Sequence, residues 1–323
     1  MSRVIYKKML KVAVLSGNDA LVDLVVDNIP YGVGYCDNLL IRFAAKRGFH
    51  KIVKKYLPFL RANPAEHRDY AIRRASEFGH SEVVKILLND KRVCPAACDN
   101  YAIVCAAQNG HVDVVKELLN HVSVDPTVGY NAPLRYAAIF NHVDVVELLM
   151  MDSRTNAADV DNHAIRWSAY YENNKVVKLL LCDPRVDPSI EEDVILSVAA
   201  ENGNVDLVEI LLDDERVNPS ARNNQALCWA ASNNHFKITN MLLSHPKLCI
   251  TAEEYMTVIT CAEHERNMVR LLKEFQNKIS FVPEPQPDLY ENITQILRNK
   301  RINITKFSII CNSFGKNKLT VEF

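Results

Sequence analysis

Glycine is scarce in this sequence, with nine residues in 323, and long uninterrupted apolar segments are missing. So few glycines leave little room for loops that cradle phosphate groups, and neither a G-x-S-x-G nor an H-E-x-x-H motif occurs. No segment reaches the 18 uncharged apolar residues that a membrane-spanning helix needs. The sequence therefore predicts a protein that is not an enzyme, needs no cofactor and has no membrane partner.

An excess of charge of either sign is also missing, because 38 basic and 39 acidic residues leave a net charge of -1. A balanced chain has no global field that favours nucleic acid. The nine cysteines are an odd number without framework spacing, which fits reduced thiols. Lys7, Lys8 and Lys11 interrupt the apolar N-terminal stretch, which is atypical of a signal peptide. We expect a cytoplasmic protein with a protein partner and no nucleic-acid partner.

What the sequence does have is a small side chain at every 31st position over most of its length. These positions are Ala13, Ala44, Ala75, Ala106, Ala137, Ser168, Ala199 and Ala230. A regular period of this order is the signature of stacked supersecondary units, each too small to bury its apolar face alone. The period therefore predicts a solenoid with eight clear repeats.

Other positions keep the same phase and divide each repeat into two helices. Six residues before the small residue, seven of the eight repeats have Asn or Asp, which favours a helix start because its side chain can cap an unpaired N–H group. Four residues after it stands Gly in five repeats and Asn at 141 and 234, and both tolerate the left-handed conformation of a helix end. Apolar pairs such as Val114-Val115 and Leu118-Leu119 then make one stripe on a second helix.

These residues resemble the ankyrin repeat. The segment from Ala106 to Leu119 is similar to the core motif of that family, as are Ala75 to Leu88 and Ala199 to Leu212, and the resemblance extends over residues 4–274. It implies an all-α solenoid of about nine units whose first helices and connector tips line a concave groove that binds a partner protein. The 31-residue period is shorter than the usual 33, and connectors such as Val186-Asp187-Pro188 resemble arrays of amoebae and of the large DNA viruses that infect them.

The end of the chain departs from the repeat. Cys261-Ala262 keeps the phase but Met268-Val269 arrives one residue early, so a ninth unit is degenerate and is expected to act as a cap. We predict an array over residues 1–278 and a tail over 279–323 with a proline-containing linker and a short helix. Residues 287–297 faintly resemble F-box-like segments that dock a ubiquitin ligase, and an amphipathic helix that closes the last repeat is the alternative.

Candidate partner-binding residues follow from the positions of the first helices that point away from the core. In the middle of the array these positions are aromatic or apolar, with polar positions toward both ends. The candidates are Phe78, Tyr136, Ile139, Phe140, Trp167, Tyr170 and Tyr171. An apolar patch with a polar rim is typical of an interface core. Phe140, Tyr171 and Trp229 could instead fill the seams between stacked repeats.

Two further columns and one cysteine cluster have competing interpretations. An arginine stands two residues before the small residue in four repeats and could bind an acidic partner segment or bond to carbonyls of neighbouring connectors. These residues are Arg42, Arg73, Arg135 and Arg166. A histidine recurs at positions 80, 111, 142 and 235, which the repeat explains better than catalysis. Cys94, Cys98, Cys105 and His67 could meet, but without a paired C-x-x-C motif we predict no metal site.

The function predicted from the sequence is a monomeric, non-enzymatic scaffold that binds a partner protein in the groove. The alternative is a substrate adaptor that recruits a ubiquitin ligase through residues 287–297 of the tail.

Overall fold

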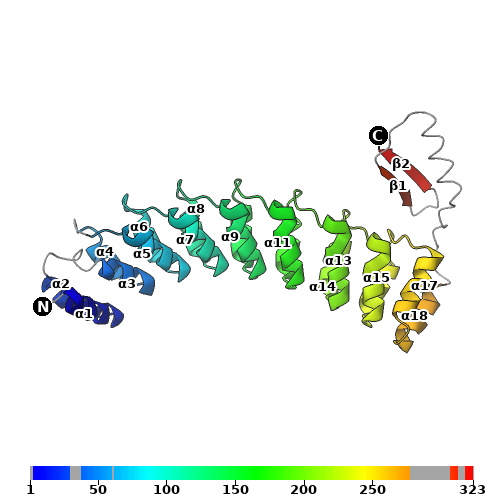
Figure 1. The fold of residues 1–323 in the computed structure, drawn as a ribbon, viewed down its shortest axis with the longest axis horizontal. Helices are drawn as coiled ribbons and strands as arrows, with labels where there is room; N and C mark the ends of the chain where they lie inside the picture. The colour runs from blue at the N-terminus through cyan, green and yellow to red at the C-terminus, as the bar shows by residue number, and fades with distance from the viewer. Residues whose placement is uncertain (1–2, 30–37, 60–61, 277–305, 312–316, 323) are drawn as a thin grey trace. The chain divides into compact units, whose positions relative to one another are not determined.

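The computed structural model describes residues 3–29, 38–59, 62–276, 306–311 and 317–322. Its residues form two units, 1–186 and 187–323 (Figure 1). The helices of the first unit are α1 (Arg3–Leu15), α2 (Asp19–Asp27), α3 (Leu39–Arg47), α4 (His50–Tyr56), α5 (Glu66–Glu77), α6 (Ser81–Leu88), α7 (Ala97–Gln108), α8 (Val112–Leu119), α9 (Val128–Ile139), α10 (Val143–Met150), α11 (Asp159–Tyr170) and α12 (Asn174–Leu180). This unit is therefore a run of six helix pairs, as the 31-residue period predicts.

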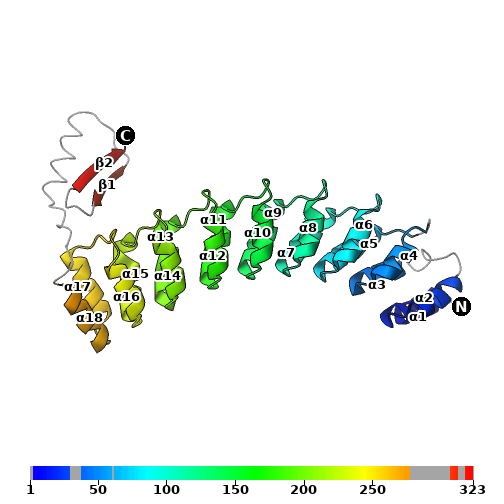
Figure 2. The same cartoon turned by 180° about the vertical axis from the view of Figure 1, so that it is seen from behind.

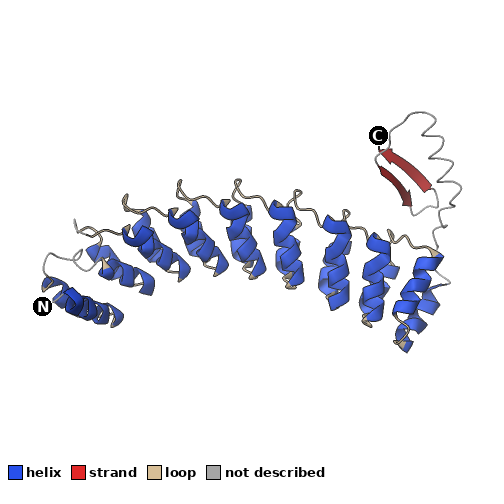
Figure 3. Ribbon diagram, viewed as in Figure 1, coloured by secondary structure: helices blue, strands red, loops and turns tan. Residues whose placement is uncertain are grey.

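The second unit continues the same pattern. Its helices are α13 (Ile190–Asn202), α14 (Val205–Leu212), α15 (Ala221–Ser232), α16 (Phe236–Leu243), α17 (Ala252–Cys261) and α18 (Arg266–Gln276). Nine pairs in the described residues confirm the all-α repeat array, and the secondary-structure view shows the pairs in sequence (Figure 3).

Two strands follow in the described part of the tail. β1 (Lys306–Cys311) pairs antiparallel with β2 (Asn317–Glu322), with Lys306 opposite Glu322 and Cys311 opposite Asn317. The sequence pattern of the tail predicts a short helix and no strand. The linker and short helix predicted between residues 280 and 297 lie outside the described residues.

Within the first unit the helices form two layers. Each first helix packs against the first helices of the neighbouring repeats, and each second helix from α4 onward packs against its own neighbours (Figures 1 and 2). Ala137 and Ala138 of α9 are fully buried, as are Val145, Val146 and Leu149 of α10. The small residue at every 31st position thus lies where the two layers approach most closely, and burial of the apolar stripe supplies the main driving force.

Asn or Asp recurs six residues before the small residue, but the reason is not the helix capping that the sequence predicts. The side chains of Asn38 and Asn131 make no capping bond to their own helices. Instead, both residues adopt positive φ angles, 50° at Asn38 and 55° at Asn131, and Asn131 ends a short left-handed turn that precedes the right-handed helix. Asn and Asp tolerate this conformation better than other residues with a Cβ atom. The N-cap prediction located the helix start correctly but gave the wrong reason.

The same side chains join consecutive repeats. Asn131 Oδ1 accepts a 2.9 Å hydrogen bond from the backbone N–H of Asn156, and its Nδ2 donates to Asp159 Oδ2 at 2.6 Å. Asn100 and Asp69 make the equivalent acceptor bonds to the N–H groups of Asp125 and Cys94. Because these groups are buried, each bond is costly to lose. The column therefore holds a connector in place against the preceding repeat.

The predicted helix stops are confirmed by backbone geometry. Gly48, Gly79, Gly110 and Gly203 have φ angles between 74° and 77°, and Asn141 and Asn234 have φ angles of 61° and 63°. Glu172 occupies the same position in the sixth repeat with a φ of 59°. A glutamate there carries the steric cost that glycine avoids.

The ninth pair differs from the others in the way its degenerate sequence suggests. Tyr255 replaces the Asn column and is fully buried, and its hydroxyl donates a 2.7 Å hydrogen bond to the carbonyl of Leu272 in α18. Helix α17 begins with a capping box between Thr251 and Glu254 instead of a left-handed turn. Here the column side chain joins the two helices of one pair.

Candidate partner-binding surface

Three aromatic side chains of the sixth repeat form a cluster at the C-terminal end of α11. The Trp167 ring lies 5.5 Å from Tyr170 in an edge-on arrangement and 5.9 Å from Tyr171 in a stacked one. Tyr170 and Tyr171 contact each other edge to face at 5.2 Å. Their exposed fractions are 38% for Trp167, 58% for Tyr170 and 52% for Tyr171. The rings are thus packed against one another while a large part of each faces solvent.

The adjoining first helix, α9, contributes the candidates of the fifth repeat. Tyr136 and Phe140 are exposed, and Ile139 is half-buried. Pro133 lies in the first turn of the right-handed part of α9, where the absence of an N–H group costs nothing. Since α9 and α11 pack side by side, these residues lie on neighbouring helices of one layer.

Phe78 of the third repeat is exposed as well, but its ring contacts are elsewhere. The Phe78 ring is stacked with that of His80, with 6.4 Å between the ring centroids, and the Lys46 ammonium group lies over it, 5.3 Å from its centroid. Helix α7, with no exposed aromatic residue, separates it from the cluster. Trp229 is also exposed but belongs to the second unit.

Sequence reasoning missed two exposed apolar residues in the left-handed turns. Tyr130 is 72% exposed and Val160 is 40% exposed, and both have positive φ angles. The helical period could not reveal them because the turn is not part of the right-handed helix. Arg135 secures the turn that presents Tyr130, since its Nε and Nη2 donate 2.9 Å hydrogen bonds to the carbonyls of Tyr130 and Gly129.

The arginine column is engaged with backbone carbonyls of its own repeat. Arg73 donates to the carbonyls of Arg68 and His67 at 2.7 and 3.0 Å, as Arg135 does two repeats later. At Arg73 and Arg135 the arginine therefore has a structural role, but the carbonyls belong to the left-handed turn of the same repeat and not to a neighbouring connector.

Electrostatics keep the aromatic cluster free of added charge near neutral pH. His163, whose ring lies 5.7 Å from Trp167, precedes it by one helical turn. Burial lowers the pKa of His163, and the nearby charges of Arg135 and Arg166 lower it further. The imidazole is therefore neutral at pH 7 and adds no charge beside Trp167.

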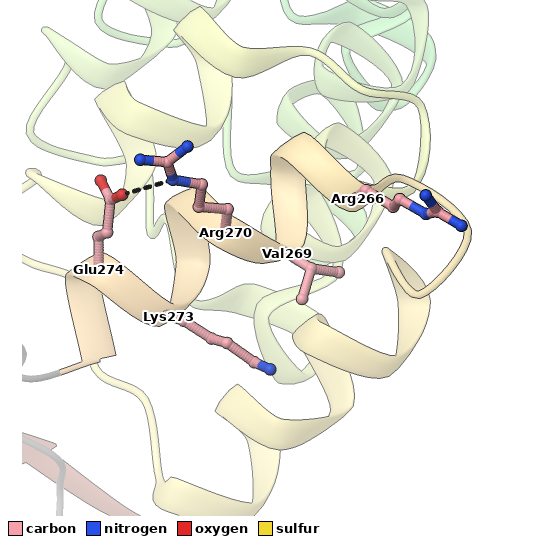
Figure 4. A pocket seen from close by; sticks show the side chains of 5 residues that line it. All are labelled: Arg266, Val269, Arg270, Lys273 and Glu274. Atoms are coloured by element: carbon pink, nitrogen blue, oxygen red, sulfur yellow. Dashed lines mark hydrogen bonds and ion pairs between the residues drawn. The ribbon is translucent and has the colours of Figure 1, made fainter.

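A separate feature lies on α18 of the second unit. Arg266, Val269, Arg270, Lys273 and Glu274 line a shallow hollow of about 480 Å³ (Figure 4). Arg270 Nε donates to Glu274 Oε1 at 3.1 Å, and both side chains are more than half exposed. Exposed pairs of this kind contribute little to binding or stability.

The described residues contain no group of three His, Cys, Asp or Glu side chains close enough together to hold a metal ion. Cys94 and Cys98 are free thiols there, as is Cys105. None of the described helices is long and apolar enough to cross a membrane.

Comparison with known proteins agrees with the fold. The family model described as ankyrin repeats (3 copies) matches residues 72–162 and again residues 165–254, which together are more than half of the chain. The chain belongs to the ankyrin-repeat family. No curated protein gives a significant match to the chain.

Proposed function

We propose that this protein is a non-enzymatic binding module that holds a partner protein on the layer of its first helices, centred on the fifth and sixth repeats. Ankyrin repeats generally mediate protein–protein interaction, which is the coarse function that the family membership supports. The observation that carries the finer proposal is the exposed aromatic cluster of Trp167, Tyr170 and Tyr171.

A cluster of this kind lowers the entropic cost of binding a partner. Aromatic side chains remove much apolar surface from water when covered, and they have few rotatable bonds to immobilise. Contacts among the three rings restrict them before the partner arrives, so less conformational entropy is lost on association. Rigid, exposed Trp and Tyr residues are typical of interface hot spots.

The experiment that tests this function compares the wild-type chain with a Trp167→Ala, Tyr170→Ala double variant. Affinity purification followed by mass spectrometry should capture the partner with the wild type and lose it with the variant. Thermal unfolding is the control, because both side chains are more than one-third exposed and the variant should remain folded. Retention of the partner by a folded double variant would refute the proposed surface.

We propose further that the array, residues 1–278, acts in the cytoplasm as a monomer without catalysis, cofactor or nucleic acid, and that the tail, residues 279–323, is a separate segment. The connector resemblance to arrays of amoebae and their viruses remains a proposal about origin. The alternative function of ligase adaptor depends on residues 287–297, which lie outside the described residues. A chain that ends at residue 278 tests it, because only an adaptor would then lose a ligase component while keeping its other partner.

A further inference from the structure

The first helices of the first unit differ in charge from one end of the layer to the other. The described side chains of α1 and α3 include Lys7, Lys8, Lys11, Arg42, Lys46 and Arg47, and neither helix contains an acidic residue. In a chain whose net charge is -1, this is a local concentration of positive charge.

Several of these cations are held on aromatic rings. Lys46 Nζ lies 5.3 Å from the ring centroid of Phe78, and Lys11 Nζ lies 5.6 Å from that of Phe43. Arg47 is exposed at the end of α3. No carboxylate among the described residues lies within ion-pair distance of Lys11, Lys46 or Arg47. Their charge is therefore not neutralised by that part of the chain.

The acidic groups of the adjoining helix α5 already have partners. Glu77 forms an ion pair with Arg74 and accepts a hydrogen bond from the Tyr101 hydroxyl. Asp69 is buried and accepts a hydrogen bond from the backbone N–H of Cys94. The exposed residues beside them are His67 and Arg68 at the left-handed turn. Glu66 precedes them and accepts a hydrogen bond from the Asn38 amide. The acidic and basic residues of α5 balance, so the excess of positive charge lies on α1 and α3.

The opposite end of the same layer is apolar and carries acidic residues at its edge. Asp161 is exposed at the turn that precedes Trp167, and Glu172 is exposed just beyond Tyr171. Gln108 and Asn109 at the end of α7, which lies between the two regions, are uncharged. A uniformly anionic ligand such as a nucleic-acid strand would be attracted by α3 and repelled beside α11.

Resting on the proposed function, we propose that the partner presents an extended segment with acidic residues at one end, seated over α3, and an aromatic or aliphatic anchor at the other, seated on the cluster of α11. Neighbouring packed helices lie roughly 8 to 10 Å apart, so the four steps from α3 to α11 span on the order of 35 Å. An extended chain covers that distance with about 11 residues.

Selection from a displayed library of random 12-residue peptides on the full chain tests this inference. The enriched peptides should place Asp or Glu residues apart from an aromatic or aliphatic group. Selection on a Lys46→Glu, Arg47→Glu variant should lose the acidic enrichment and keep the apolar one. Salt should weaken binding of an enriched peptide to the wild type by about tenfold between low and high ionic strength, and much less to the variant.

Each other outcome has a definite meaning. Enriched peptides without acidic residues, or with the same composition on both proteins, would overturn the inference while leaving the proposed function intact. Tighter binding of a 12-nucleotide oligo-dT strand than of the best peptide would overturn it in favour of a nucleic-acid ligand. If no peptide is enriched, the inference is contradicted too. If the same peptides are enriched on the Trp167→Ala, Tyr170→Ala variant as on the wild type, the proposed function is contradicted as well.

Discussion

His142 occupies the space into which a side chain at Gly110 would extend. A Cβ atom at Gly110 would stand 2.5 Å from His142 Nδ1, and His142 Nε2 donates a 2.9 Å hydrogen bond to the carbonyl of Gln108. The recurring histidine is thus a structural contact between successive repeats. Where the stop residue is Asn141, the next repeat has the smaller Asn173, whose Nδ2 donates to the carbonyls of Ala138 and Ile139.

The first prediction follows from this pairing. Replacing Gly110 by Ala should destabilise the protein by about 2 kcal/mol or more. A residue with a Cβ atom is strained in the left-handed conformation of Gly110, and the His142 imidazole would have to move away from the new methyl group. Chemical denaturation measures the change. A Gly110→Asn, His142→Asn double variant, which copies the Asn141 and Asn173 pair, should recover most of the loss. If the double variant is as unstable as the sum of the single changes, the pairing is not the reason for the histidine.

The second prediction concerns the buried carboxyl group of Asp193. Burial raises its pKa to about 6 from the ordinary value of 3.8, and only the N–H of Asn218 offers it a compensating hydrogen bond. Its Oδ1 has no hydrogen-bond partner within the described part of the chain. Because the folded pKa is raised, the ionised form costs stability above pH 6, and this cost disappears as the pH falls from 6 toward 4.

Asp193→Asn should therefore stabilise the protein at pH 7 by roughly 1 to 3 kcal/mol. Asn occupies the same column in most other repeats, so the backbone conformation is compatible. Denaturation at pH 7 and at pH 4.5 measures the change, and the gain should shrink at the lower pH. A stabilisation that does not depend on pH would show that ionisation of Asp193 is not its cause.

The third prediction addresses the bond between connectors. Asn131→Ala should cost about 1 to 3 kcal/mol, because the buried N–H of Asn156 loses its acceptor and Asp159 loses a donor. Equilibrium denaturation measures it. Asn109→Ala is the matched control, since the Asn109 side chain bonds only to the carbonyl of Cys105 within its own helix, in a partly exposed position. Equal effects for the two changes would mean that Asn131 does not join the repeats.

Much of the fold could be predicted from the sequence because stacking imposes the same contacts in every repeat. The small residue, the Gly stop and the apolar stripe each have a local cause, so their period revealed them. The role of Asn131 could not be predicted, because its partner, Asn156, lies 25 residues away in a contact that only the stacked repeats create. The exposure of Tyr130 could not be predicted either, because helical periodicity does not extend through a left-handed turn.

The exposure of the candidate residues could be predicted from the sequence only in part. The phase of α11 placed Trp167 and Tyr170 away from the core, but it could not show that Tyr171 stacks on Trp167 and remains half exposed. Ile139, predicted to point outward, is half-buried. Ile139 is less exposed than predicted because adjoining first helices pack against α9, and a helical wheel drawn for one helix does not include its neighbours.

The central claim, that the partner sits on the first helices at the aromatic cluster, is tested most directly by photo-crosslinking. A photoreactive phenylalanine derivative at position 170 should become linked to the captured partner, whereas the same group at Phe236, an exposed aromatic position on the second helix α16, should not. Crosslinking from position 236 with none from position 170 would contradict the account.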